Sequence, residues 1–285
     1  MRCSALAEEL GEPMIGSVDR RVRWILVEDR SAWGSDAVKD VLGEEFARDA
    51  KARGVRPLLI RRREGDPEAD TVRRAILVDT GSGEMAVRAI GDPSELQLNA
   101  LVDDPVAAFG APMTDPIFLV CTNGKRDACC ALRGRVLATA LAPDHAEQTW
   151  ECTHLGGHRF AGNLVCLPHG IVYGRVTPND GPRLADAYLE GRLDPELLRG
   201  RSAWPAPAQV AERELRLQLG FDGVADVTIV SVEADGDRAT VRLAAPDGTT
   251  HTLQLVAERL APPRPTSCRA DEVEEPMHWR VLDAV

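Results

Sequence analysis

Two cysteines and two histidines stand at spacings that could hold a metal. Cys121 and Cys130 have eight residues between them, His154 and His158 have three, and twenty-three residues separate the two pairs. Two thiolates and two imidazoles can bind a zinc ion, or a 2Fe–2S cluster as in a Rieske centre. The cysteine pair is wider than the zinc-finger spacing of about two to four residues. Spacing alone leaves three interpretations open: a cluster, a zinc ion, or an ordinary fold with buried thiols.

Two further cysteines are alternative ligands. Cys129 adjoins Cys130, and Cys152 lies two residues before His154, on the same face of the expected strand. We interpret Cys129 as an inert helix residue or spare thiol, and Cys152 as a core thiol near the site.

The remaining cysteines and histidines have simpler expected roles. Cys166 lies between two apolar residues of a strand and is expected to be a buried small hydrophobe. Free thiols are expected at two positions and solvated imidazoles at three, namely Cys3, Cys268, His145, His169 and His251.

The elements that must position the four candidate ligands follow a recognisable order. Cys121 comes directly after a short apolar strand, and the carboxyl edge of an open α/β sheet is the usual place for a site. The histidines lie in a loop with two glycines, which leave room for a bulky ligand. The expected elements are a strand at 116–120, a helix at 129–141, a strand at 148–152, a hairpin at 164–167 and 171–176, and a helix from 177 to about 191.

The first part of the chain repeats this order without candidate ligands. We expect strands at 24–28 and 56–61 around a helix at 37–52, a hairpin at 75–80 and 85–91, and a helix at 93–102. Strand, helix, strand, hairpin, helix is the thioredoxin-like order. The pattern predicts a pseudo-repeat over roughly 20–105 and 112–200.

The last part of the chain changes character after residue 204. An amphipathic helix at 209–219 precedes strands at 227–234, 239–245 and 250–256, which predicts a small α+β module. We expect the proline-rich tail from Pro262 to wrap another surface rather than form a core of its own.

Composition narrows the class of protein. The 285 residues carry a formal net charge of −11, which argues against a general nucleic-acid binder and suits a protein that docks onto a basic partner. We find no signal peptide and no apolar run of about 20 residues that could span a bilayer. Seven cysteines, four of them clustered, indicate a metal or redox role in the reducing cytoplasm. We expect no membrane partner, and a monomer or weak homo-oligomer.

The strings CTNGKRDACCALRGRVLA and TWECTHLGGHRFAGNLVCLPHGIVYGRVTP resemble the bacterial sucrase/ferredoxin-like family, as do RCSAL and PRPTSC. Residues 116–190 also resemble thioredoxin-like ferredoxins. Fungal members of this broader group bind a 2Fe–2S cluster through two cysteines and an H-x3-H pair. The resemblance implies that Cys121, Cys130, His154 and His158 are the cluster ligands.

The resemblance implies a thioredoxin-like ferredoxin fold for the second unit, and together with the repeated order of elements it leads us to expect an α/β chain in three parts. These are a ligand-free thioredoxin-like unit at 1–108, a cluster-bearing unit at 109–203, and an α+β module with the proline-rich tail at 204–285. The sequence offers no carboxylate pair that would support glycoside hydrolysis.

We therefore expect an electron-transfer protein that exchanges single electrons with an unidentified redox partner protein. Histidine ligation raises the potential of a 2Fe–2S centre relative to four cysteines, and an imidazole could couple electron uptake to proton uptake. No catalytic residue is assigned, and a carrier is favoured over a stand-alone enzyme. The alternatives are a zinc-stabilised binding module and a thiol-based redox enzyme that uses Cys129 or Cys130, although the latter lacks a C-x-x-C motif.

Overall fold

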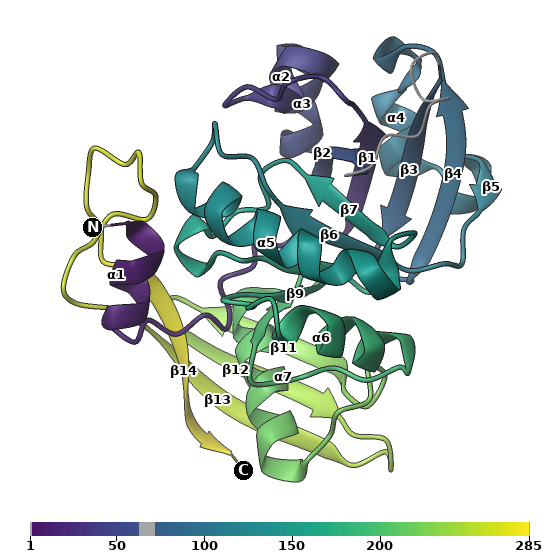
Figure 1. The fold of residues 1–285 in the computed structure, drawn as a ribbon. Coiled ribbons are helices and arrows are strands. Elements are labelled where there is room, and N and C mark those ends of the chain that lie inside the picture. The colour runs from purple at the N-terminus through teal and green to yellow at the C-terminus, as the bar shows by residue number, and fades with distance from the viewer. Residues whose placement is uncertain (1, 63–71, 285) are drawn as a thin grey trace.

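The computed structural model describes residues 2–62 and 72–284. They form a mixed α/β fold with a ten-stranded mixed sheet and a separate four-stranded antiparallel sheet (Figure 1). The strand order of the large sheet is β10-β9-β8-β6-β7-β2-β1-β3-β4-β5. A short helix, α1 (Cys3–Glu9), precedes both sheets.

The first half of the large sheet is built around parallel strands β1 (Arg23–Glu28) and β2 (Val55–Arg61). β3 (Arg73–Asp79) pairs antiparallel with β1, and β4 (Glu84–Ile90) pairs with β3. The flanking elements are α2 (Ala37–Leu42), α3 (Glu44–Ala52), η2 (Pro93–Glu95), α4 (Leu98–Asp103), η3 (Val106–Ala108) and β5 (Ala111–Pro112).

Two predicted helices of this half are interrupted. The helix predicted at 37–52 is split into α2 and α3 at Gly43, whose φ of 91° lies outside the helical region. The helix predicted at 93–102 is a 3₁₀ turn closed by an Asp92 capping box, followed by α4. The hairpin and both parallel strands lie where the sequence predicts them.

The second half repeats the pairing of the first. β6 (Ile117–Cys121) and β7 (Thr149–Cys152) are parallel around the long helix α5 (Ala128–His145), and β8 (Leu164–Leu167) pairs antiparallel with β6. The remaining elements are η4 (His158–Phe160), β9 (Ile171–Tyr173), α6 (Asp180–Leu189) and β10 (Leu198–Arg201). In both halves the strands therefore lie in the order second, first, third, fourth.

The two halves meet edge to edge. β2 pairs antiparallel with β7, with Ile60 opposite Cys152 and Arg61 opposite Glu151. The Arg61 guanidinium donates to the Glu151 carboxylate at 3.1 and 3.2 Å across this junction. The junction makes one continuous sheet.

The smaller sheet follows helix α7 (Ala206–Leu219). Its strands are β11 (Thr228–Asp235), β12 (Arg238–Ala244), β13 (Thr250–Arg259) and β14 (Met277–Ala284), all antiparallel. The sequence prediction missed β14: the tail does run toward α1, but it then returns to pair with β13 (Figure 1).

All residues of β6 are buried, and the alternation of faces along the strand decides which side chains lie on the side of the candidate site. Phe118 and Val120 belong to the core beneath α5 and α6, whereas Leu119 and Cys121 belong to the core on the opposite face, together with Cys130. This alternation follows from the two-residue period of a strand.

Among the described residues, no helix has both the length and the apolar composition that are needed to cross a membrane.

Candidate metal centre

Cys121 is the last residue of β6, and its side chain is buried. Beyond it the chain turns at Asn123, whose side-chain oxygen accepts hydrogen bonds from the amides of Lys125 and Arg126. α5 then packs directly against the strand end, because a Cβ at Gly134 would overlap the Cys121 carbonyl. The strand-to-helix turn therefore fixes the first thiol beside the start of α5.

The start of α5 holds two buried cysteines that face different neighbours. Asp127 is the N-cap, and its carboxylate accepts from the Cys129 amide at 2.8 Å. Cys130 packs in the same core as Cys121, whereas Cys129 packs with Cys3 and Ala161. Successive helical residues project about 100° apart, so one helix start serves two clusters.

His154 lies in the loop between β7 and η4, and His158 is the first residue of η4. Their rings stack with centroids 4.0 Å apart and planes 10° apart. Gly156 and Gly157 have φ of 82° and 67°, in the left-handed region that favours glycine. A Cβ on Gly157 would also overlap the guanidinium of Arg199, so this loop needs glycine for both backbone and space.

All four predicted ligands lie together, and we call them the Cys/His site. Ligand atoms of Cys121, Cys130 and His154 lie within 4.8 Å of one another. Nδ1 of His158 lies 3.5 Å from Sγ of Cys130. Cys152 is buried in the adjacent strand, opposite Cys121, and is not part of this group.

The surroundings set the charge of the donor atoms. A hydrogen bond from the Cys130 thiol, followed by contact with His154, holds the pKa of Cys121 well below its usual value. The pKa of Cys130 is raised, because its thiol donates that hydrogen bond and is buried. Burial lowers the pKa of His158 to about 3, so this imidazole is neutral and has a lone pair for a metal.

Two arginines beside the site were not foreseen from the sequence. Arg199, from β10, is 2% exposed and donates to Asn163 Oδ1 at 2.6 Å and to the Gly156 carbonyl at 3.3 Å. Arg56, from β2, donates to the His154 carbonyl at 3.2 Å and lies over the Trp24 ring. Within 2–62 and 72–284, neither guanidinium forms an ion pair with a carboxylate.

Burial is costly for both guanidinium groups, and for Arg56 the nearby Asp19 carboxylate offsets part of that cost. Burial lowers the pKa of Arg199 to about 9 and also lowers the pKa of Arg56. The neighbouring thiols of Cys121 and Cys130 act in the opposite direction on Arg199. These cations are therefore matched to negative charge at the Cys/His site. Arg159, by contrast, has its charge balanced by Glu12, whose carboxylate lies 2.6 Å away.

A cavity of about 400 Å³ opens beside His154. Basic side chains outnumber acidic ones in its lining, which includes Asp19, Arg21, Asp36, Lys39, Lys51, Arg56, Arg126, His154 and Gly156. The cavity gives the His154 side of the site contact with solvent, while His158 is only 9% exposed.

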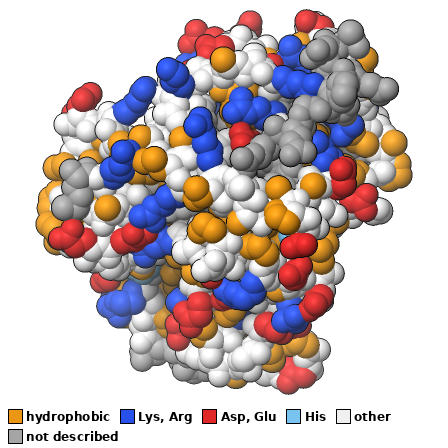
Figure 2. Space-filling model, viewed as in Figure 1, with side chains coloured by type: hydrophobic (Ala, Val, Ile, Leu, Met, Phe, Trp, Pro, Cys, Tyr) orange, Lys and Arg blue, Asp and Glu red, His pale blue; other side chains and the backbone are white. Residues whose placement is uncertain are grey.

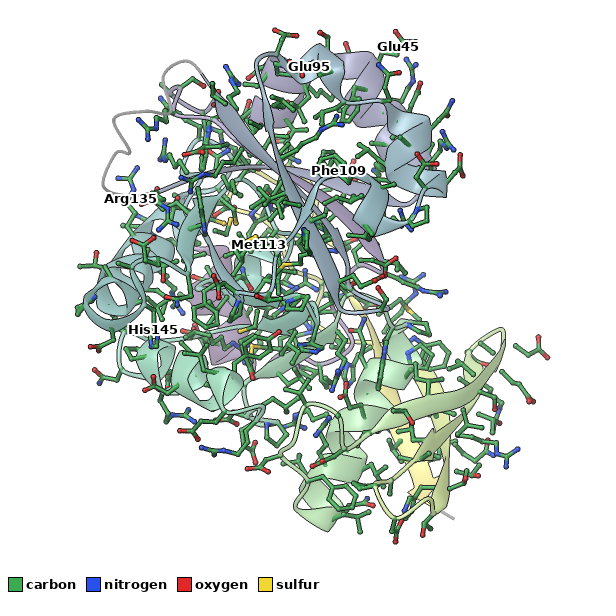
Figure 3. All side chains as sticks on the ribbon, turned by 90° about the vertical axis from the view of Figure 1, so that its right-hand side faces the viewer. Glu45, Glu95, Phe109, Met113, Arg135 and His145 are labelled. Atoms are coloured by element: carbon green, nitrogen blue, oxygen red, sulfur yellow. The ribbon has the colours of Figure 1, made fainter. Side chains whose placement is uncertain are left out.

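One expectation about the other residues is corrected. His145 is buried at the end of α5 (Figure 3), with Nε2 3.1 Å from Asp186 Oδ1, so it is not a solvated side chain. His169 is exposed, as expected, and its Nδ1 lies 2.6 Å from the Tyr188 hydroxyl. Cys3 and Cys268 are free thiols, as expected, and they lie in one cluster with Cys129.

The donor set fits a metal or a metal–sulfide group. It combines two buried sulfurs, a neutral imidazole at His158 and a second imidazole at the cavity, and two glycines leave space beside it.

Comparison with known proteins places the chain among relatives of fungal origin. The relatives named "Altered inheritance of mitochondria protein 32" include one from Meyerozyma guilliermondii, 34% identical over 89 residues, which cover 27% of this chain and 31% of the relative. Those from Eremothecium gossypii and Candida glabrata are 30% and 25% identical over 135 and 118 residues, 42% and 40% of this chain and 41% and 35% of each relative.

The chain thus spans between about a third and two fifths of the length of these curated relatives. No solved structure matches the chain. The family described as Sucrase/ferredoxin-like matches residues 14–200, a range that contains all four residues of the Cys/His site. Because this match covers more than half of the sequence, the chain belongs to the Sucrase/ferredoxin-like family.

Proposed function

We propose that this protein binds a 2Fe–2S cluster through Cys121, Cys130, His154 and His158 and exchanges single electrons with a protein partner. The observation that carries the proposal is Arg199, which is 2% exposed, lies beside the Cys121 and Cys130 thiols and forms no ion pair with a carboxylate of the described residues; the half-buried Arg56 adds a second cation near the site.

The charge of the site distinguishes a cluster from zinc. A zinc ion with two thiolates and two neutral imidazoles is electrically neutral and stays so. A 2Fe–2S cluster with the same ligands supplies reversible one-electron chemistry, and the site gains one negative charge on reduction. Arg199 and Arg56 stabilise that added charge, which favours the reduced form and raises the potential. Buried cations have no comparable role beside a permanently neutral zinc site.

Residues around the four proposed ligands hold the thiols and the imidazoles in place. The β6 end and the Asp127 cap hold the two thiols, and the two loop glycines let the backbone approach without side chains. The Arg199 guanidinium ties this loop to Asn163, so the imidazoles are held at fixed positions. A site held rigidly reorganises little when its charge changes, which suits electron transfer.

The cavity beside His154 is the proposed face for the partner. Its lining is locally basic, which favours an acidic partner there, in contrast to the net charge of −11. On the face drawn in Figure 2, basic and acidic side chains are interspersed rather than separated. The local charges at the cavity are therefore a better guide to the partner than the total.

Metal analysis of anaerobically purified protein tests the proposal. We expect about two irons and two acid-labile sulfides bound per chain at this site, with visible absorbance. Zinc in the Cys/His site without iron would support the zinc-stabilised binding module instead. A metal-free chain with a reactive Cys129 or Cys130 would support the thiol-based enzyme.

We further propose that electron uptake is coupled to proton uptake at an imidazole. The ring of His154 lies at the cavity, so a proton has a path to solvent. A redox titration should show a potential that falls as pH rises, by about 59 mV per unit for one proton per electron. A potential that stays constant between about pH 6 and 10 would reject the coupling but not the cluster.

The finer fold assignment is also a proposal. We propose two thioredoxin-like units in tandem, at 1–108 and 109–203, because both halves of the sheet share one strand order and one sequence of elements. We propose a reducing cytoplasmic location, since all seven cysteines are free. The name of the relatives points instead to mitochondria, and localisation of the tagged chain would decide between the two locations.

A further inference from the structure

A second group of sulfur atoms lies on the other side of the α5 start. Cys3 comes from α1, Cys129 from α5 and Cys268 from the segment before β14. Their Sγ atoms lie 3.7 Å apart for Cys3 and Cys129, 3.3 Å for Cys129 and Cys268, and 3.5 Å for Cys268 and Cys3. Figure 1 shows α1 beside the loop of the tail that carries Cys268.

We propose that Cys3, Cys129 and Cys268, together with Asp127, bind one zinc ion at a site separate from the Cys/His site. We call this group the three-thiol site. It does not depend on the proposed electron-transfer function, because none of its four residues belongs to the Cys/His site.

The sulfur geometry points to a single ion. A tetrahedral zinc with Zn–S bonds of about 2.3 Å places its sulfurs about 3.8 Å apart, close to all three observed separations. A disulfide would need about 2.05 Å and would leave the third thiol without a role. An iron–sulfur cubane binds each cysteine to a different iron, and its cysteine sulfurs would lie further apart than these.

The Asp127 carboxylate supplies the fourth donor atom, an oxygen, beside the three cysteine sulfurs. Its Oδ2 lies 3.9 Å from the Cys3 sulfur and accepts from the Cys268 amide at 2.8 Å. Its Oδ1 accepts from the Cys129 amide. One fully buried carboxylate therefore orients the backbones of two cysteines and keeps a lone pair for the ion.

The surroundings fit a structural ion with one accessible side. Cys3 and Cys129 are 2% and 1% exposed, whereas Cys268 is exposed and leaves an entry path. The Ser4 hydroxyl donates to the Cys129 sulfur at 3.3 Å, an outer contact of the kind that orients metal ligands. On binding, each thiol loses its proton to solvent and no electron is transferred.

The ion would join three distant parts of the chain. It would tie α1 and the tail to the start of α5, which also carries Cys130. Asp127 lies between the two groups, with Oδ2 4.0 Å from Nδ1 of His158. Zinc at the three-thiol site would therefore hold in place the helix end on which the Cys/His site is built.

The test is zinc and cobalt binding by a chain that lacks the Cys/His thiols. The reduced Cys121→Ser/Cys130→Ser variant should retain one zinc per chain and should show thiolate-to-cobalt charge-transfer absorption with Co²⁺. Adding Cys268→Ser should reduce zinc affinity by more than roughly 100-fold, since losing even an outer partner of a ligand costs about 10–100-fold. Because Cys268 is exposed, this change should leave the fold intact, as far-ultraviolet circular dichroism would verify.

A matched control is Arg269→Ala in the same background, an exposed neighbour that should leave zinc affinity unchanged. The proposal is overturned if the double variant binds neither Zn²⁺ nor Co²⁺, or if Cys268→Ser and Arg269→Ala bind zinc equally well. It is also overturned if mass spectrometry of untreated protein shows a disulfide among the three cysteines in place of bound metal.

Discussion

Cys129 and Cys130 are neighbours on one helix, yet they belong to two groups of opposite character. The Cys/His site draws all four residues from 121–158 and lies beside two arginines, of which Arg199 is buried and forms no ion pair with a carboxylate of the described residues. The three-thiol site draws on residues 3, 127, 129 and 268 and contains a buried carboxylate. The first environment favours added negative charge, whereas the second favours a cation.

The contrast shows how one helix start can serve two chemistries. The 100° rotation between successive helical residues directs the two thiols to different cores, and Asp127 lies between them. The functional difference therefore comes from the partners that each thiol meets, since the two residues themselves are identical in type.

The largest expected effect comes from replacing Cys129 or Cys130, one at a time, with serine. Cys130→Ser should abolish iron binding and visible absorbance, because it removes a donor of the Cys/His site. Cys129→Ser should keep both, because its sulfur faces Cys3 and Cys268. Iron analysis and absorbance measure this directly, and the reverse pattern would show that the two cysteines are assigned to the wrong sites.

The next effect concerns the ion pairs that join the surroundings of the two sites. Glu12 accepts from Arg159 of the histidine loop at 2.6 Å and from Arg264 of the tail at 2.9 Å, and it is 1% exposed. Glu12→Gln should lower the free energy of unfolding by about 3–5 kcal/mol, because it leaves the buried Arg264 and the half-buried Arg159 without their carboxylate. Urea denaturation measures the change.

The control for this prediction is Glu196→Gln, which breaks an exposed pair with Arg213. Exposed pairs contribute about 0–1 kcal/mol, so this variant should be close to wild type. Equal losses in both variants would mean that Glu12 does not join the tail to the histidine loop.

A smaller effect is expected in the histidine loop. Gly157→Ala should cost roughly 1–2 kcal/mol from its left-handed backbone, plus the displacement of Arg199. Gly191→Ala is a matched control, since its φ is 76° but a Cβ there meets nothing within 4 Å. We expect both variants to lose a similar free energy of unfolding from the backbone strain, and only the Gly157→Ala variant to retain iron more weakly. Equal iron retention would count against the loop as a metal-binding element.

The smallest effect is on the reduction potential. Arg56→Gln should lower the potential by tens of millivolts, because about 59 mV corresponds to 1.4 kcal/mol for one electron and the removed charge is buried near the thiols. Arg56→Lys keeps the charge and should change the potential less. Protein-film voltammetry compares the two variants. Identical shifts in both would show that the charge of Arg56 does not set the reduction potential.

The secondary structure could be predicted well wherever local pattern controls it. The first four strands of each half and the first three strands of the small sheet follow from apolar runs between turns, whereas the edge strands β5 and β10 were not predicted. The break at Gly43 and the strand β14 could not be predicted this way. The first depends on one glycine conformation, and the second depends on pairing with β13.

The grouping of Cys121, Cys130, His154 and His158 was predictable because one strand, one helix and one loop carry all four within 38 residues of sequence. By itself, then, the sequence determined a local donor set and the elements that present it. The tertiary structure alone decided what surrounds that set. Arg56 and Arg199 reach it from strands at different places in the sheet, and Cys3 and Cys268 meet Cys129 only because the two ends of the chain pack against α5. Such contacts carry no local pattern, since the entropy of closing long loops is offset by burial that involves the whole fold.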